Sequence, residues 1–250
     1  MGRFQLQNRL LEQGRVAVKN LEIEFIGDIE EMRWETLFTK EPETIEWLGR
    51  IPDNSLYVDV GSNIGVYVLL AYAMGVKSVI AIEPYSRSMC SLLMNMRKNA
   101  VDSILPLNVG LFESNRLLSL SGRSMEPGAA EFAYEDLTDI SDSTVLFIDG
   151  RLVADLAIAS SNGPISLKLD VDGGEIEALE SLQRVFVEKR CRSAMVETSI
   201  GTTEEKVVSM MSNWGYSIDS FYEDFSPHSN DRRRLEQGNV AKNIVFIPEA

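Results

Sequence analysis

The stretch LYVDVGSNIGVYVLLAYAM, residues 56–74, contains three consecutive patterns. LYVDV is a short apolar run that predicts a buried strand. GSNIG follows at residues 61–65, and its two glycines are typical of a tight turn. The apolar run up to Met74 predicts a helix that Gly75 ends. A strand, a glycine turn and a helix in this order form a unit of an α/β domain with parallel strands.

The alternation of strand and helix continues on the C-terminal side of this unit. SVIAIE at residues 78–83 and ILPLNV at 104–109 predict strands, and SRSMCSLLMNMRKNA between them predicts an amphipathic helix. ISLKLD at 165–170 and SAMVET at 193–198 predict two further strands, each followed by a helix, the first from about Glu175 to Lys189. We therefore expect an α/β fold with a mostly parallel sheet.

Three parts of the chain depart from this alternation. Residues 1–50 mix polar and apolar positions, and we expect them to form an N-terminal cap segment on a main domain of residues 51–250. Residues 111–163 carry Gly, Ser, Pro and Asp between short apolar runs, which predicts short strands and loops. YSIDSFY and NIVFI near the end have no helical pattern between them, which predicts an antiparallel terminal hairpin.

Charge and composition restrict the partners. The chain has 38 acidic and 24 basic residues, a formal charge of −14, so attraction to phosphate does not favour a nucleic-acid partner. No apolar run reaches the roughly 18 residues of a membrane span, and the polar start has no signal-peptide core. Cys90 and Cys191 have no metal-ligand spacing, and we expect both to be reduced. We expect a cytoplasmic protein with no membrane partner and no metal site; the oligomeric state stays open.

The glycine turn and an acidic residue after it indicate an adenosine ligand. Asp59, Gly61, Asn63 and Gly65 lie at the carboxyl end of the first predicted strand, where ligands bind in open α/β sheets. The helix after the turn presents free amide donors to such a ligand. Glu83 ends the second predicted strand, twenty-two positions after Gly61, where a carboxylate can accept hydrogen bonds from both hydroxyls of a ribose.

The spacing in the turn favours one class of adenosine ligand. A dinucleotide site has the pattern G-x-G-x-x-G, whereas here the second glycine comes four residues after the first. Asp59 immediately before the turn would repel phosphate and attract an ammonium. This combination suits S-adenosylmethionine, which carries an amine and a cationic sulfonium. A glycine turn that only connects strand and helix is the alternative for GSNIG taken alone.

Several segments resemble a known family in order, from about residue 41 to residue 216. They are EPETIEWLGRIPDNSLYVDVGSNIG, AIEPYSRSMCSLLMNMRKNA, LNVGLFES, ISLKLDVDGGEIEALESL and MVETS. This set resembles the FkbM family of S-adenosylmethionine-dependent methyltransferases. Asp172 stands where the family usually has glutamate, and Ser62 where alanine is usual. Residues 121–160 match poorly.

The resemblance has implications for fold and activity. It implies a Rossmann-like class I methyltransferase sheet of seven strands, S-adenosylmethionine as the cofactor, and most often O-methylation of a hydroxyl on a sugar or natural product. The acceptor would then be a small hydroxylated molecule. A nicotinamide-dependent oxidoreductase would need a phosphate-compatible glycine turn and a hydride-relay acid, and the sequence offers neither clearly. A non-catalytic S-adenosylmethionine-binding or interaction protein that keeps the fold is the alternative.

Cofactor contacts are expected at the ends of the first three predicted strands. Asp59, Gly61 and Gly65 should hold the methionine end, and Glu83 the ribose. The end of the third strand should form a wall for the adenine. The full set of expected cofactor-binding residues is Asp59, Gly61, Ser62, Asn63, Gly65, Glu83, Pro84, Asn108, Val109 and Asp170.

Candidate catalytic residues lie on the next two strands. Lys168 and Asp170 share one face of their strand, and Asp170 is close to its carboxyl end. Glu197 ends the neighbouring strand at the same edge. Methyl transfer is an in-line displacement that requires an aligned acceptor oxygen, and a hydroxyl must also lose its proton. We expect Asp170 to face the methyl group and to orient or deprotonate the acceptor, with Lys168 keeping it ionised. Glu197, Lys168 if burial lowers its pKa, and His228 are further candidate bases.

Each of these residues also has a structural interpretation. Lys168 can form a buried ion pair with Asp170 or Glu197. Glu175 is expected to cap or orient the following helix rather than to touch a substrate. His228 and the arginines at 232–234 lie in a polar stretch typical of a solvated loop, although such a loop near the ligand edge can bind an anionic acceptor.

Overall fold

The computed structural model describes residues 2–6, 20–130, 132–225 and 241–249. His228 and residues 232–234 lie outside these ranges, so the expectations about them stay predictions. In the described part of the chain, no helix combines the length and apolar character that a bilayer-spanning segment requires.

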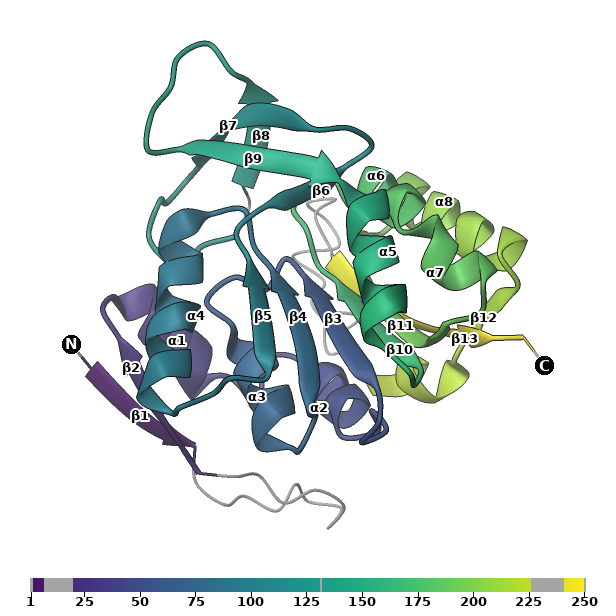
Figure 1. Ribbon diagram of the computed structural model, residues 1–250, viewed down its shortest axis with the longest axis horizontal. Coiled ribbons are helices and arrows are strands. Elements are labelled where there is room, and N and C mark those ends of the chain that lie inside the picture. Colours follow the sequence, from purple (N-terminus) through teal and green to yellow (C-terminus); the bar gives the residue numbers. More distant parts are fainter. Residues whose placement is uncertain (1, 7–19, 131, 226–240, 250) are drawn as a thin grey trace.

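A seven-stranded sheet forms the centre of the molecule (Figure 1). Its strands are parallel except β13, which runs antiparallel to both of its neighbours. The pairing of β12 with β13 confirms the terminal hairpin expected from the sequence. The strand order across the sheet is β12 (Tyr216–Ile218), β13 (Ala241–Pro248), β11 (Cys191–Ser199), β10 (Ile165–Leu169), β3 (Leu56–Val60), β4 (Ser78–Ile82) and β5 (Ile104–Leu107).

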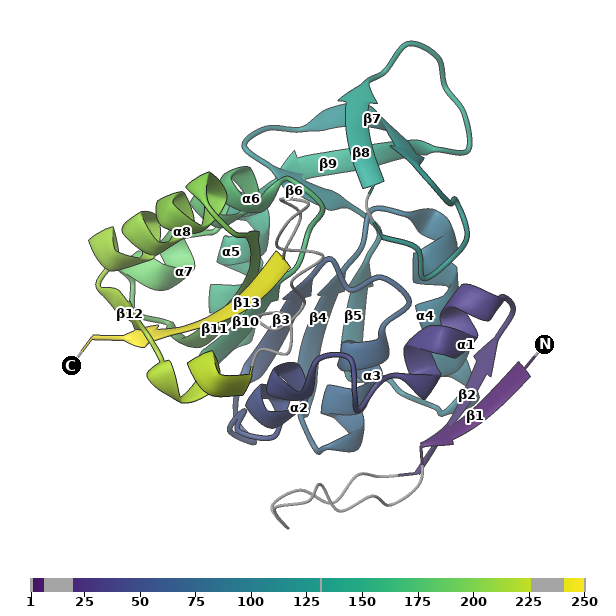
Figure 2. The ribbon, with the colours of Figure 1, turned by 180° about the vertical axis from the view of Figure 1, so that it is seen from behind.

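Helices cover both faces of this sheet (Figures 1 and 2). One face shares a core with α2 (Pro42–Leu48), α3 (Val66–Ala73) and α4 (Ser86–Lys98). The other packs on α5 (Gly150–Ser160), α6 (Glu175–Ser181), α7 (Gln183–Val187) and α8 (Thr202–Asn213). All five residues of β3 and of β10 are buried, as expected for central parallel strands covered on both sides. The short 3-10 helix η1 (Ser220–Phe225) follows β12.

The N-terminal segment joins the same core. Strands β1 (Gly2–Leu6) and β2 (Leu21–Phe25) pair antiparallel, and α1 (Asp28–Glu35) follows. Two asparagines of α4 bind β2 as a neighbouring strand would. The Asn95 side chain accepts from the Glu24 amide at 2.8 Å and donates to the Glu24 carbonyl at 3.0 Å. Asn99 makes the same pair of bonds with Glu22, both at 2.8 Å.

A second, four-stranded sheet lies beyond the carboxyl ends of β3, β4 and β5 (Figure 1). Its order is β6 (Gly110–Phe112), β9 (Thr144–Asp149), β7 (Arg116–Gly122) and β8 (Phe132–Asp136). Its buried side chains, including Leu118 and Phe147, pack with Tyr85 at the start of α4. The small sheet therefore encloses the edge at which ligands bind in α/β folds.

Two expectations about helices are wrong. Helix α5 replaces the loops expected up to residue 163. Its N-terminus is capped by Asp149, which accepts from the Arg151 amide at 3.0 Å, and Val153, Ala154 and Ala157 are buried at helical spacing. The single helix expected from Glu175 is two short helices, α6 and α7, which meet at Leu182.

Candidate active site

The glycine turn between β3 and α3 is held by the backbone of the neighbouring strand. The amides of Gly61 and Ser62 both donate to the Ile82 carbonyl at 2.9 Å. Gly61 has φ +85°, and a Cβ there would lie 1.7 Å from the Asp170 carbonyl oxygen. Glycine is thus required at position 61 because the end of β10 packs against the turn. This contact also holds Asp170 beside the turn.

Glu83 anchors the far side of the turn. Its carboxylate accepts from the Asn63 amide at 2.8 Å and from the Tyr85 amide at 2.7 Å. Burial raises the pKa of Glu83 to about 7, against the lowering effect of these two amides. Each carboxylate oxygen can accept a second bond, so the group can hold the turn and still accept from a ligand's hydroxyls.

Asn108 and Val109 follow β5 at the same edge. The side-chain amide of Asn108 donates to the carbonyls of Glu83 at 2.8 Å and Pro84 at 3.0 Å. Asn108 therefore ties the ends of β4 and β5 together. Val109 lines a cavity beside them.

Two adjoining cavities lie between the edge of the main sheet and the small sheet. The aromatic cavity, about 510 Å³, is lined on one side by the strand ends and by Val109 and on the other by residues of the small sheet, among them Phe112, Tyr134 and Phe147. The turn cavity is lined by Gly61–Ile64, Glu83, Lys168 and Asp170 and reaches α1 and α3. The two share Gly61, Pro84, Phe132, Tyr134, Val171 and Asp172.

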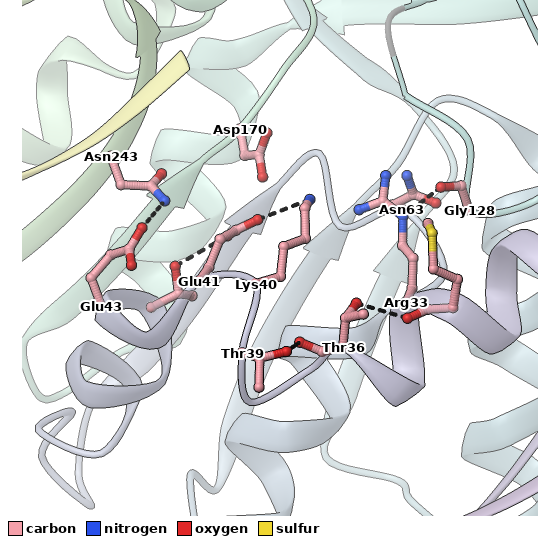
Figure 3. Close-up of polar contacts among 12 residues, drawn as sticks. Arg33, Thr36, Thr39, Lys40, Glu41, Glu43, Asn63, Gly128, Asp170 and Asn243 are labelled. Carbon is pink, nitrogen blue, oxygen red and sulfur yellow. Dashed lines mark hydrogen bonds and ion pairs between the residues drawn. The ribbon is translucent and has the colours of Figure 1, made fainter. Parts of the chain in front are cut away.

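Hydrogen bonds hold the connection between β7 and β8, and the start of β8, next to the glycine turn. Asn63 donates through its side-chain amide to the Ala129 carbonyl at 2.7 Å. The Phe132 amide donates to the Asp172 carboxylate at 3.0 Å. Arg33 of α1 donates through Nε to the Gly128 carbonyl, next to Asn63 (Figure 3). These bonds hold the small sheet, the turn and the N-terminal segment together around the turn cavity.

A buried ionic cluster occupies the carboxyl ends of β3, β10 and β11. Lys168 is 1% exposed, and its Nζ lies 2.5 Å from Oδ2 of Asp170. In the sheet register Lys168 pairs with Asp59 of β3. Burial alone would lower the pKa of Lys168, but Asp170, Asp59 and Glu41 outweigh it and raise that pKa. Lys168 is therefore charged at neutral pH.

The acids of this cluster carry different charges. Burial would raise the pKa of Asp170, but Lys168 holds it well below its usual value, so Asp170 is ionised. The negative charge of Asp170, together with burial, raises the pKa of Glu197 far above its usual value, so Glu197 keeps its proton at neutral pH. Burial raises the pKa of Asp59 to about 6, although Lys168 opposes this. The side chain of Asp170 is 29% exposed and can meet a ligand.

The N-terminal segment closes the cluster from below (Figure 3). Lys40 forms an ion pair with Glu41 at 3.1 Å, and Asn243 of β13 donates to Glu43 at 3.0 Å. Burial would raise the pKa of Glu41, but Lys168 and Lys40 lower it, so Glu41 is ionised. Asp170 lies above Lys40 and Glu41 in the same view.

One polar atom of the turn cavity fits a ligand's carboxylate. The Ser62 hydroxyl is buried, lines this cavity and has no hydrogen-bond partner among the described residues. Buried polar atoms normally have one, so this hydroxyl can donate to a bound carboxylate. Asp59 lies behind the lining of the cavity, next to Tyr57. In the described part of the chain, no group of three or more His, Cys, Asp and Glu side chains is arranged to hold a metal ion.

The structure brings most of the predicted residues together and adds others. Asp59, Lys168, Asp170 and Glu197 form one cluster, beside the turn and Glu83. Glu175 accepts from the Gly173 amide at 3.3 Å in the loop before α6, and no side chain among the described residues caps this helix, so its expected orienting role stays a prediction. The sequence did not indicate a further set that lines the two cavities: Arg33, Tyr67, Phe132 and Tyr134. Phe132 and Tyr134 alternate on β8, a pattern that could have marked one face of a strand.

The strand order, with a glycine turn after the central strand β3 and an acid at the end of β4, defines a class I methyltransferase fold. A family model described as the methyltransferase FkbM domain matches residues 59–218, more than half of the chain, and the chain belongs to this family. It is a methyltransferase, and its cofactor is S-adenosylmethionine. A search of curated proteins found no match.

Solved structures with a similar fold are remote in sequence. Precorrin-6y C5,15-methyltransferase from Geobacter metallireducens is 16% identical, with 70% of each chain covered and a TM-score of 0.38. The ribosomal protein L11 methylase from Lactobacillus delbrueckii is 13% identical, with 90% of this chain and 81% of that chain covered and a TM-score of 0.44. Fibrillarin from Aeropyrum pernix, solved with bound S-adenosylmethionine, is 13% identical, with coverages of 82% and 73% and a TM-score of 0.44.

Replacing Glu83 by alanine is expected to weaken cofactor binding about tenfold or more. If Glu83 holds the ribose as the sequence predicts, the change removes charge-assisted hydrogen bonds worth roughly 1.5–3 kcal/mol. Calorimetry with S-adenosylhomocysteine measures the effect, and Glu113→Ala, an exposed site on the loop after β6, is the control. Unchanged affinity in a folded Glu83→Ala protein would remove Glu83 from the ribose site.

Cofactor affinity should also fall as the pH falls from 8 to 6. The free carboxyl of Glu83 has a pKa of about 7, raised by burial and by nearby Asp172 and Asp59, so about nine-tenths of it is protonated at pH 6. A ribose-binding carboxylate must then lose this proton on binding, which lowers affinity up to about tenfold. Glu83→Gln has no titrating group at this position. It should bind the cofactor weakly, and its affinity should depend less on pH. A wild-type affinity that is constant over this range would contradict the assignment.

Proposed function

We propose that the enzyme transfers the methyl group to a hydroxyl oxygen of a small molecule, such as a sugar or another natural product. The observation that carries this proposal is the placement of ionised Asp170 beside the glycine turn, with charged Lys168 and protonated Glu197 next to it. A hydroxyl acceptor needs a group that orients it and takes its proton, and this cluster contains one.

The cofactor is proposed to extend across both cavities. Gly61, Ser62 and Asn63, which line the turn cavity, would surround the methionine end, with Asp59 and Gly65 adjoining them behind the lining. Glu83 would hold the ribose, and Pro84 and Val109 would contact the adenine in the aromatic cavity, with Asn108 fixing that wall through its bonds to the end of β4. Bound in this way, S-adenosylmethionine supplies an electrophilic methyl group.

The residues of the chain then perform three tasks. Asp170 accepts a hydrogen bond from the acceptor hydroxyl and aligns its oxygen with the methyl group. The proton moves to the Asp170 carboxylate as the new C–O bond forms, because the hydroxyl becomes acidic only at that stage. Lys168 keeps Asp170 ionised until then, and Glu197 fixes the orientation of its carboxylate. The walls of the small sheet exclude water.

The acceptor class is supported by charge. A formal charge of −14 repels the phosphates of RNA and disfavours a nucleic-acid acceptor. A non-catalytic S-adenosylmethionine-binding protein is the second candidate, and the ion pair by which Lys168 keeps Asp170 ionised argues against it, because binding a cofactor requires no such proton acceptor.

The test is methyl transfer from S-adenosylmethionine carrying a deuterated methyl group. Purified protein is incubated with a panel of sugars, sugar nucleotides and polyhydroxylated natural products, and with RNA and protein pools as competing acceptors. We expect S-adenosylhomocysteine release and a deuterated methyl on an oxygen of a small molecule, detected by mass spectrometry and NMR. Label only in RNA or protein, or cofactor binding with no turnover on any acceptor, would contradict the proposal.

A further inference from the structure

Arg33 is the free positive charge of the turn cavity. Among the described residues that line it, the cations are Arg33 and Lys168. Lys168 is engaged by Asp170 and lies among acids, whereas no carboxylate in the described ranges lies within ion-pair distance of Arg33. Its one hydrogen bond among the described residues, from Nε to the Gly128 carbonyl, fixes the guanidinium and leaves both terminal nitrogens available.

The glycine turn itself has few donors left for an anion. The amides of Gly61 and Ser62 donate to Ile82, that of Asn63 to Glu83, that of Ile64 to the side chain of Asn63, and that of Gly65 to the Ser62 carbonyl. All five amides of the turn are thus used within the protein. A carboxylate in this cavity must find its partners elsewhere.

Two kinds of donor besides Arg33 remain among the described residues at this cavity. The Ser62 hydroxyl, 6% exposed, has no partner in the described part of the chain. The first helical bond of α3 runs from Leu69 to Gly65, and no side chain caps the helix, so its first amides are open. Arg33 lies near enough to Tyr67, in the first turn of α3, that its charge opposes the burial-driven rise in the pKa of that tyrosine. Figure 3 shows Arg33 reaching from α1 to Asn63 of the turn.

We propose that Arg33 binds the carboxylate of the methionine portion of S-adenosylmethionine, together with Ser62 and the start of α3. This inference rests on the proposed placement of the cofactor. A planar guanidinium held by one bond at Nε can bind a carboxylate with two parallel hydrogen bonds. Arg33 lies outside the matched residues 59–218, so the N-terminal segment completes the cofactor site rather than only covering the sheet.

The test compares two ligands that differ in this carboxylate. S-adenosylhomocysteine carries the whole amino-acid portion, and 5′-methylthioadenosine lacks it. In calorimetry, Arg33→Met should bind S-adenosylhomocysteine about 10- to 100-fold more weakly than wild type. Arg33→Lys should lose less affinity, because lysine keeps the positive charge but cannot make two parallel hydrogen bonds. Both variants should bind 5′-methylthioadenosine as tightly as wild type. Arg87→Met, which removes an exposed arginine paired with Asp142, should change neither affinity.

Two results would overturn the inference. An equal loss for both ligands would show that Arg33 supports the fold through Gly128 and not the carboxylate. Unchanged affinity of Arg33→Met for S-adenosylhomocysteine would mean that the carboxylate of the cofactor binds elsewhere. Arg33 would then be available to bind a carboxylate of the acceptor. Loss limited to the ligand with the carboxylate supports the inference. The wild-type protein should bind 5′-methylthioadenosine, because this ligand contains the adenosine part of the cofactor. If it does not bind, the proposed placement of the whole cofactor is wrong, whatever the role of Arg33.

Discussion

Asp170→Asn is expected to lower turnover by about 10²- to 10⁴-fold and to leave cofactor affinity nearly unchanged. The substitution keeps the size of the side chain and removes its negative charge. Asparagine cannot take the acceptor's proton, and its amide no longer pairs with Lys168, whose Nζ is 2.5 Å from the carboxylate. Because the methionine end is expected to contact mainly the turn, the dissociation constant should stay similar.

Release of S-adenosylhomocysteine, measured with an identified acceptor, gives the turnover number. Asp155→Asn is the matched control, since Asp155 is an exposed residue of α5 that pairs with Arg184. A rate near that of wild type for Asp170→Asn would exclude Asp170 as the base. His228 would then be the next candidate, because Glu197 keeps its proton at neutral pH.

Lys168→Met should be the most destabilising single change in the site. It removes the buried positive charge that faces Asp170, Asp59 and Glu41, and leaves them only the more exposed Lys40, which pairs with Glu41. Loss of one partner from a buried ion pair typically costs about 3–5 kcal/mol of unfolding free energy. Urea unfolding at pH 8 measures this loss, and turnover should fall as well, because Asp170 becomes easier to protonate.

Two comparisons separate this effect from a simple loss of packing. With Lys168 gone, the carboxylates titrate at higher pH and protonation relieves their repulsion, so the loss of stability should shrink as the pH falls from 8 to 5.5. Adding Asp170→Asn should restore part of the stability. Lys242→Met, which breaks a partly exposed pair with Glu204, should cost only about 0–1 kcal/mol. A Lys168→Met protein as stable as wild type at pH 8 would contradict the ionic account.

The sequence predicted the central sheet because its strands are buried on both faces. Such strands appear in the sequence as continuous apolar runs, as in β3 and β10. The glycine turn between β3 and α3 marks where the strand ends and the helix begins. The alternation of Lys168, on β10, with Asp170, directly after this strand, likewise predicted their common face, and the structure joins them in an ion pair.

The small sheet and the N-terminal segment that surround the site could not be predicted from the sequence in this way. The small sheet depends on pairing between distant segments, such as β6 with β9, which short apolar runs do not specify. Arg33 reaches the turn through the docking of the N-terminal segment, in which β2 buries alternate apolar residues in the core. Asparagine side chains at the C-terminal end of α4 bind the backbone of β2 as well, and this contact has no periodic signal in the sequence. Gly61 was interpreted as a point of ligand approach, and the structure adds a different reason, the Asp170 carbonyl that a Cβ would strike.

A crystal structure of the protein with S-adenosylhomocysteine tests the central claim most directly. We predict that both ribose hydroxyls lie within hydrogen-bonding distance of the Glu83 carboxylate, that the amino-acid portion lies in the turn cavity, and that the sulfur faces Asp170. A ligand bound away from the turn, or a ribose held by residues other than Glu83, would contradict the account.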